Sequence, residues 1–160
     1  MNDTNERPAP PWRRLVALLY ELLVVAAILL VAVMASLLLT HGHLDVHAWW
    51  YRIALLVAIE AYFVVSWVRG GQTLGMRAWR LHLRSADGTA LDPGRAMLRF
   101  ALVASPLLLL GLAYVVGPRG GIAAPFVAWT LDLASVAFDW RRRALHDILA
   151  GTWVAYRPAA

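Results

Sequence analysis

Four long apolar blocks, separated by polar and arginine-rich segments, dominate the pattern of the chain. They cover residues 15–39, 48–68, 98–116 and 122–138. A helix of about 20 apolar residues crosses the hydrocarbon core of a bilayer, and the shortest block is at the lower limit of that length. The pattern therefore predicts an all-α membrane protein with four transmembrane helices.

The segments outside these blocks define the expected domain limits. Residues 1–12 are polar and proline-rich, which predicts a disordered leader. The first block is longer than the apolar region of about 7–15 residues in a cleavable signal, so we interpret it as an uncleaved anchor. Cleavage near Ala35 is the alternative. Residues 13–156 then form the transmembrane domain, and residues 157–160 form a short tail.

The segment between the second and third blocks has a different pattern. Apolar and basic side chains alternate over residues 78–84, and this period of two is typical of a strand. Asp87 and Gly88 predict a turn, and Asp92 before Pro93 predicts the start of a helix. We expect a short amphipathic or strand-like segment, and the pattern leaves open whether residues 69–92 form a hairpin or a surface helix.

Composition and charge give this architecture an orientation. The chain is 61% hydrophobic and 16% charged, too apolar for a soluble domain of 160 residues. All 15 basic residues are arginine, and all but Arg52 and Arg119 fall on one side of a four-span protein. Because positive charge stays inside, both termini are predicted to be cytoplasmic. A re-entrant hairpin in place of the last two spans would not change that orientation.

Several other classes of protein are disfavoured. The pI of about 10.4 would suit a nucleic-acid binder, but the arginines cluster at the ends of apolar blocks, where lipid headgroups lie. The chain has no cysteine, which excludes disulfides and cysteine-based metal sites. It contains no nucleophile elbow, phosphate loop or zinc-protease motif. We therefore expect no nucleic-acid partner, no cofactor and no enzymatic activity.

Three acidic residues, Glu21, Glu60 and Asp132, lie within the apolar blocks. An ionised carboxylate costs at least about 2.5–3.5 kcal/mol there, so each needs a partner. They could join helices by hydrogen bonds, or form a cation or proton path tuned by Arg14. Arg14 lies two helical turns from Glu21, roughly 10 Å along the axis, and that distance is too long for direct contact. We expect Arg14 to pair with a carboxylate on another helix.

The loop after the first block contains a possible metal-binding pattern. In an extended segment, alternate side chains project to one side, and here these are His41, His43, Asp45 and His47. The alternative is a polar loop in which Asp45 caps the second membrane helix. We favour the polar loop and predict no metal site.

Three segments together carry a resemblance to a known family. They are RRLVALLYE, GQTLGMRAWRLHLRSADG and RRRALHDILAGT, in this order along the chain. The sequence resembles the RDD family of bacterial membrane proteins, which is named for one arginine and two aspartates. The resemblance implies that Arg14 is the family arginine and that Glu21 occupies the first aspartate position. Asp147 is the second aspartate, with Asp132 as the competing assignment. The remaining motif positions on the cytoplasmic side are Gly71, Gln72, Thr73, Gly75, Arg143 and His146.

The resemblance implies a multi-pass protein of the bacterial inner membrane. Because a single unit of four helices offers little room for a substrate pathway, we expect a homo-oligomer in the lipid bilayer. Exchange of monovalent cations for protons has been suggested for some members of the family. We therefore expect either cation/proton exchange through the intramembrane carboxylates or a scaffold. In the scaffold, the arginine-rich cytoplasmic face would bind lipid headgroups or a partner protein.

Overall fold

The computed structural model describes residues 6–158 and has four helices long and apolar enough to cross a membrane. The first two are α1 (Pro11–Leu39) and α2 (Trp49–Gly70). The third is built from α4 (Pro93–Ala104), the 3₁₀ helix η1 (Ser105–Leu112) and α5 (Ala113–Val116). The fourth is α6 (Pro118–Ala134), extended by η2 (Ser135–Ala137). The four helices predicted from the apolar pattern are confirmed.

Helix starts are the main difference from the predicted boundaries. The first and fourth helices begin earlier than predicted, and the third begins at Pro93 as predicted, so all three start at a proline. Proline suits the first turn of a helix because the missing N–H would have no helical partner there. At Pro93 the predicted N-cap is confirmed, since Asp92 accepts hydrogen bonds from the N–H groups of Gly94 and Arg95.

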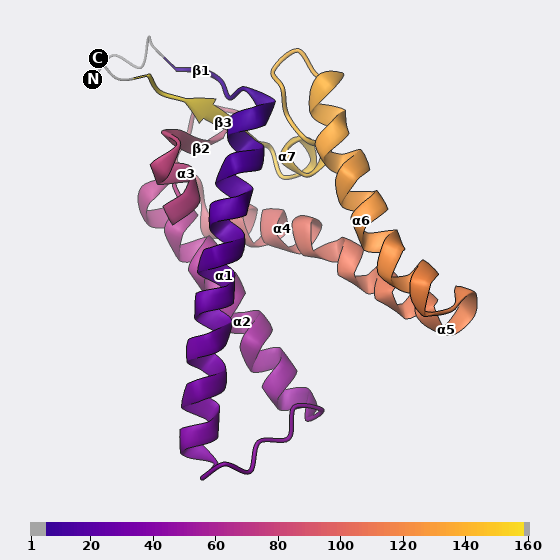
Figure 1. The fold of residues 1–160 in the computed structure, drawn as a ribbon. Coiled ribbons are helices and arrows are strands. Elements are labelled where there is room, and N and C mark those ends of the chain that lie inside the picture. The colour runs from indigo at the N-terminus through magenta and orange to yellow at the C-terminus, as the bar shows by residue number, and fades with distance from the viewer. Residues whose placement is uncertain (1–5, 159–160) are drawn as a thin grey trace.

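The four long helices form two hairpins, α1 with α2 and the α4–α5 segment with α6. Figure 1 shows the hairpins meeting at one end of the molecule and spreading apart away from it. Large apolar side chains, among them Leu23, Leu38 and Leu108, remain exposed along these helices. Exposure of leucine in long apolar stretches is what a surface covered by lipid tails requires.

A small sheet lies at the end where the hairpins meet (Figure 1), and it includes segments from near both ends of the described residues. It consists of β1 (Arg7–Pro8), β2 (Leu81–Ser85) and β3 (Thr152–Tyr156), antiparallel in the order β1-β3-β2. Two short helices, α3 (Leu74–Ala78) and α7 (Leu145–Leu149), accompany it. We call this end of the molecule, with β1–β3, α3 and α7, the sheet end.

The strand predicted from alternating residues is confirmed as β2. The Leu81 and Leu83 side chains are buried, whereas the alternating His82 and Arg84 are less so. The segment 69–92 is neither a hairpin nor a surface helix alone: α3 precedes β2, and β2 pairs with β3 from the far end of the chain.

The expectation of a disordered leader over residues 1–12 is wrong for its second half. Arg7–Pro8 forms β1, Ala9 is fully buried and donates from its N–H to the carbonyl of Val154 (3.0 Å), and α1 begins at Pro11. These residues are ordered because β3 offers its free edge as a hydrogen-bonding partner. Residues 1–5 lie outside the described residues. At the other terminus, Arg157 of the predicted tail contacts Glu6 (3.1 Å).

Candidate functional site

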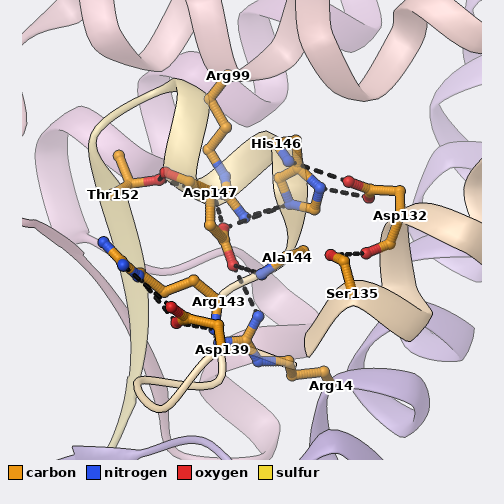
Figure 2. Close-up of polar contacts among 10 residues, drawn as sticks. All are labelled: Arg14, Arg99, Asp132, Ser135, Asp139, Arg143, Ala144, His146, Asp147 and Thr152. Carbon is orange, nitrogen blue, oxygen red and sulfur yellow. Dashed lines mark hydrogen bonds and ion pairs between the residues drawn. The ribbon is translucent and has the colours of Figure 1, made fainter. Parts of the chain in front are cut away.

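A fully buried carboxylate, Asp147 of α7, lies at the centre of a charge cluster at the sheet end (Figure 2). Its Oδ2 accepts from Arg14 Nη1 at 2.7 Å and from the Ala144 N–H at 3.0 Å. Its Oδ1 accepts from Arg99 Nη1. One carboxylate therefore joins guanidinium groups from α1 and α4. The expectation that Arg14 pairs with a carboxylate on another helix is confirmed.

Arg99 extends the cluster to two more elements. Its Nη1 donates to the hydroxyl of Thr152 in β3 at 2.8 Å, and its guanidinium lies 5.2 Å from the centre of the Trp67 ring in α2. Arg14 and Arg99 are both buried. Because burying an unpaired guanidinium is costly, both arginines depend on Asp147 as their ion-pair partner.

His146 connects the cluster to the fourth membrane helix. Its Nδ1 lies 2.5 Å from Asp132 Oδ2, and its backbone N–H donates to Asp132 Oδ1 at 3.0 Å. The other ring nitrogen, Nε2, faces Arg99 Nη2 at 3.1 Å. Nε2 also lies 3.3 Å from Asp147 Oδ1, so the imidazole contacts both carboxylates of the cluster. Asp132 is thereby tied to α7 and, through His146, to α4.

The electrostatics of Asp147 favour the ionised form of the carboxyl group. Burial by itself raises the pKa of this carboxyl, but Arg99, His146 and Arg14 outweigh burial and hold the pKa well below its usual value. A carboxylate that stays charged at neutral pH and is held by two guanidinium groups is suited to joining helices. It is poorly suited to releasing and binding protons.

Glu21 forms a second buried contact, separate from Arg14. Its Oε1 accepts from the Gly75 N–H at 2.7 Å, and its Oε2 accepts from the Tyr62 hydroxyl at 2.9 Å. A Cβ added to Gly75 would lie 2.5 Å from the Ala17 carbonyl oxygen, so α3 can approach α1 this closely only with glycine there. Glu21 thus docks α3 on α1 and links both to α2.

The motif Gly71–Thr73, which precedes α3, forms hydrogen bonds with the edge strand β2 and caps α3. The Gly71 carbonyl accepts from the Leu83 N–H at 2.6 Å, and Gly71 itself has a left-handed φ of 63°. The Gln72 side chain donates to the Leu81 carbonyl at 2.7 Å, and Thr73 caps α3 by accepting from the Met76 N–H. These residues supply β2 with the hydrogen bonds that a further strand would give.

The structure brings some of the predicted site residues together and leaves others apart. Arg14, Asp132, His146 and Asp147 share one cluster. Arg143 instead pairs with Asp139 at 3.0 Å. Within residues 6–158, no hydrogen bond or ion pair joins Glu21, Glu60 and Asp132 to one another, and Glu60 has no such partner at all.

Sequence reasoning missed Arg99, Tyr62 and Thr152 as members of these contacts. Arg99 could have been found, because an arginine one turn or more inside a membrane helix requires a partner, like an acid at the same depth. Tyr62 and Thr152 have no such signal, since both residue types are common where no buried contact is made.

The histidine-containing loop does not assemble a site. Across residues 6–158, no group of three or more histidine and acidic side chains could hold a metal ion. His47 contacts Arg52 at 3.1 Å. The proposed cap by Asp45 is wrong: α2 follows Ala48 without a side-chain cap, and Asp45 accepts from the His47 N–H at 2.8 Å. This local turn satisfies Asp45 before the helix begins.

Comparison with known proteins gives one match. The model of the RDD family matches residues 8–151, which include the charge cluster from Arg14 to Asp147 and the Gly71–Gly75 motif. No curated protein and no solved structure matches the chain.

Proposed function

Since this chain belongs to the RDD family and has four helices able to cross a membrane, we propose that it is a non-catalytic scaffold of the bacterial inner membrane. In this proposal it is a multi-pass protein whose sheet end faces the cytoplasm and binds anionic lipid headgroups through arginine side chains.

The observation that carries this proposal is a set of exposed arginines at the sheet end. Their guanidinium groups make no hydrogen bond or ion pair within the part of the chain that the structure describes, and they belong to Arg7, Arg69, Arg77, Arg80 and Arg142. The acidic side chains of the same end already have arginine partners, as in Arg84–Glu6, Arg95–Asp87 and Arg143–Asp139. The remaining positive charge is therefore available to phosphate groups, each arginine adding about 1 kcal/mol near an anionic surface.

Aromatic side chains beside these arginines support a position at the headgroup level. The Trp12 and Trp79 rings meet edge to face at 5.8 Å, and the Arg13 guanidinium lies 4.7 Å from the Trp12 ring. Trp140 and Phe138, which follow the fourth membrane helix, are strongly exposed. Tryptophan next to arginine at the end of a span is typical of the membrane–water interface.

Native mass spectrometry of the detergent-solubilised full chain tests the proposal. We expect more phosphatidylglycerol than phosphatidylcholine to stay bound to the wild type. A variant with Arg69→Gln, Arg77→Gln, Arg80→Gln and Arg142→Gln should lose most of that preference. The control carries Arg52→Gln and Arg119→Gln at the opposite end and should keep it. Equal retention of both lipids by the wild type, or an unchanged preference in the first variant, would contradict headgroup binding.

Cation/proton exchange is the second candidate, and the observation that favours it is Glu60, which has no hydrogen-bond or ion-pair partner within residues 6–158. Glu21 and Asp132 are less suited to carrying ions, because hydrogen bonds to Gly75, Tyr62 and His146 already occupy their oxygens. Vesicles containing a pH-sensitive dye and the reconstituted protein distinguish the two functions. Exchange predicts a dye response to sodium, potassium or lithium that disappears in a Glu21→Gln, Glu60→Gln, Asp132→Asn variant. The absence of a dye response from the wild type under every cation gradient would exclude exchange and favour the scaffold function.

A further inference from the structure

Glu60 differs from the other acidic residues that the structure describes. Each of the others accepts at least one hydrogen bond, whereas none is made to Glu60 within residues 6–158. Glu60 lies near the middle of α2, where the hydrocarbon core is deepest. A carboxyl group there costs several kcal/mol unless it finds a partner.

The position of Glu60 on α2 shows which surface needs that partner. Residues three and seven positions apart share a helix face, so Glu60 lies on the same face as Phe63 and Trp67. These two rings face α4: Phe63 lies 5.9 Å from Phe100, and Trp67 stacks with Arg99. Tyr62, which contacts Glu21 of α1, points to the opposite side. The face with Glu60 is therefore covered by α4 near the sheet end and is turned away from α1.

Further from the sheet end the same face is apolar and uncovered. It consists of Ile53, Leu56 and Val57, which are 51%, 46% and 53% exposed, followed by the half-buried Glu60. The spacing i, i+3, i+4 and i+7 forms one continuous stripe, as in helices that pack side by side. We call these four residues the Glu60 stripe.

The chemistry of the stripe selects its occupant. Lipid tails cover apolar side chains but offer no hydrogen bond. In this chain the arginines of the spanning helices lie near the helix ends, far from the middle of α2. A neutral carboxyl group carries both a donor and an acceptor, so it is complementary to an identical group. A two-fold axis beside α2 would place the same apolar residues and the same carboxyl group opposite each other.

We propose that the Glu60 stripe is a homodimer interface, in which two α2 helices pack side by side and their Glu60 carboxyl groups hydrogen-bond across the two-fold axis. Polar pairs of this kind hold membrane helices together because the separated groups would lie unpaired in lipid. The interface is independent of headgroup binding at the sheet end.

The absence of cysteine from the chain makes disulfide crosslinking a clean test. Leu56→Cys introduces a thiol on the stripe, and Val65→Cys is its control. The two positions are similarly exposed (46% and 44%), and their spacing of nine residues places them on opposite faces of α2. Each full-length variant is reconstituted in phosphatidylcholine vesicles, oxidised with copper–phenanthroline and analysed on a non-reducing gel. We expect a crosslinked dimer from Leu56→Cys and at least about tenfold less from Val65→Cys.

A second substitution tests the carboxyl group itself. Adding Glu60→Leu to Leu56→Cys should weaken association about tenfold, measured as the lipid dilution at which half of the dimer is lost. Adding Glu60→Gln should preserve association, because the amide is also donor and acceptor. Because no contact of Glu60 within residues 6–158 is a hydrogen bond or ion pair, we expect Glu60→Leu to keep the monomer fold, and circular dichroism checks this. Equal crosslinking at both cysteine positions, or a Glu60→Leu variant that associates like its parent, would overturn the proposal. By contrast, a wild type that shows no preference for phosphatidylglycerol would contradict headgroup binding at the sheet end but would not bear on the proposed dimer interface.

Discussion

Arg14 and Asp147 are 133 residues apart in the chain and form an ion pair of 2.7 Å that is almost entirely excluded from solvent. The pair joins the first turns of α1 to α7, and Arg99 brings α4 to the same carboxylate. Helices from both hairpins are thus held at one end by a single buried charge.

Removal of one partner of the Arg14–Asp147 pair should strongly destabilise the protein. Arg14→Gln removes one of the two guanidinium groups that neutralise the buried Asp147 carboxylate. Removing one partner of a buried ion pair lowers the free energy of unfolding by about 3–5 kcal/mol. Asp147→Asn should cost a similar amount, and the double variant less than the sum of the two. Thermal unfolding of the full chain in detergent measures these effects. The exposed Arg77→Gln is the control and should change stability by less than about 0.5 kcal/mol; a similar loss in that variant would show that the effect is not specific to the buried pair.

Acid should weaken the charge cluster through Asp147. The pKa of this carboxyl in the folded protein lies well below its ordinary value of 3.8, because Arg99, His146 and Arg14 outweigh its burial. The unfolded chain therefore binds the proton first, so the stabilisation is complete above about pH 4–5 and decreases as the pH falls toward the folded-state pKa. Melting temperatures between pH 6 and pH 3 should fall more steeply for the wild type than for Asp147→Asn.

A control for this pH dependence is Asp139, whose pKa is lowered to about 2, first by its hydrogen bond with Arg143. Asp139→Asn removes this separate pair and should retain most of the steep fall below pH 4. Parallel pH profiles for the wild type and Asp147→Asn would exclude Asp147 as the source of acid sensitivity.

A methyl group at Gly75 should loosen the contact between α3 and α1. The Cβ of Gly75→Ala would lie 2.5 Å from the Ala17 carbonyl and 2.7 Å from Glu21 Oε1, so the helices must separate. Overpacking of this kind costs about 1–3 kcal/mol. Gly70→Ala is the matched control, because nothing lies within 4 Å of the added atom. Thermal unfolding should show a loss for Gly75→Ala alone; equal melting temperatures would mean that α3 does not dock as tightly as described.

Reporter fusions test the orientation inferred from the arginines. Gly42 lies in the turn between α1 and α2, and Gly88 lies in the turn after β2, next to the sheet end. A fusion at Gly88 should report the cytoplasm, and one at Gly42 should report the opposite side. Cytoplasmic reporters at both positions would contradict four spans, and the inverse pattern would place the sheet end outside.

Local sequence patterns predicted the parts of this protein that depend on neighbouring residues. The apolar blocks predicted four helices, Asp92 with Pro93 predicted a helix start, and the alternation around His82 predicted a strand. Each signal depends on residues a few positions apart. The pairing of β2 with β3, and the use of Ala9 and its neighbours as a sheet edge, depend on segments far apart and had no local signal.

The charges show the same division. By itself, the sequence determined that this chain belongs in a membrane, because no soluble fold of its size could bury so much apolar surface, and it identified Arg14 as a charge in need of a carboxylate. Only the tertiary structure decided which carboxylate forms the ion pair with Arg14. Several carboxylates are equally plausible by spacing, and the choice of Asp147 over Glu21 and Asp132 follows from how α1, α4, α6 and α7 converge at the sheet end. Within residues 6–158 the same convergence leaves Glu60 without a hydrogen-bond or ion-pair partner, while α4 contacts α2 at Phe63 and Trp67.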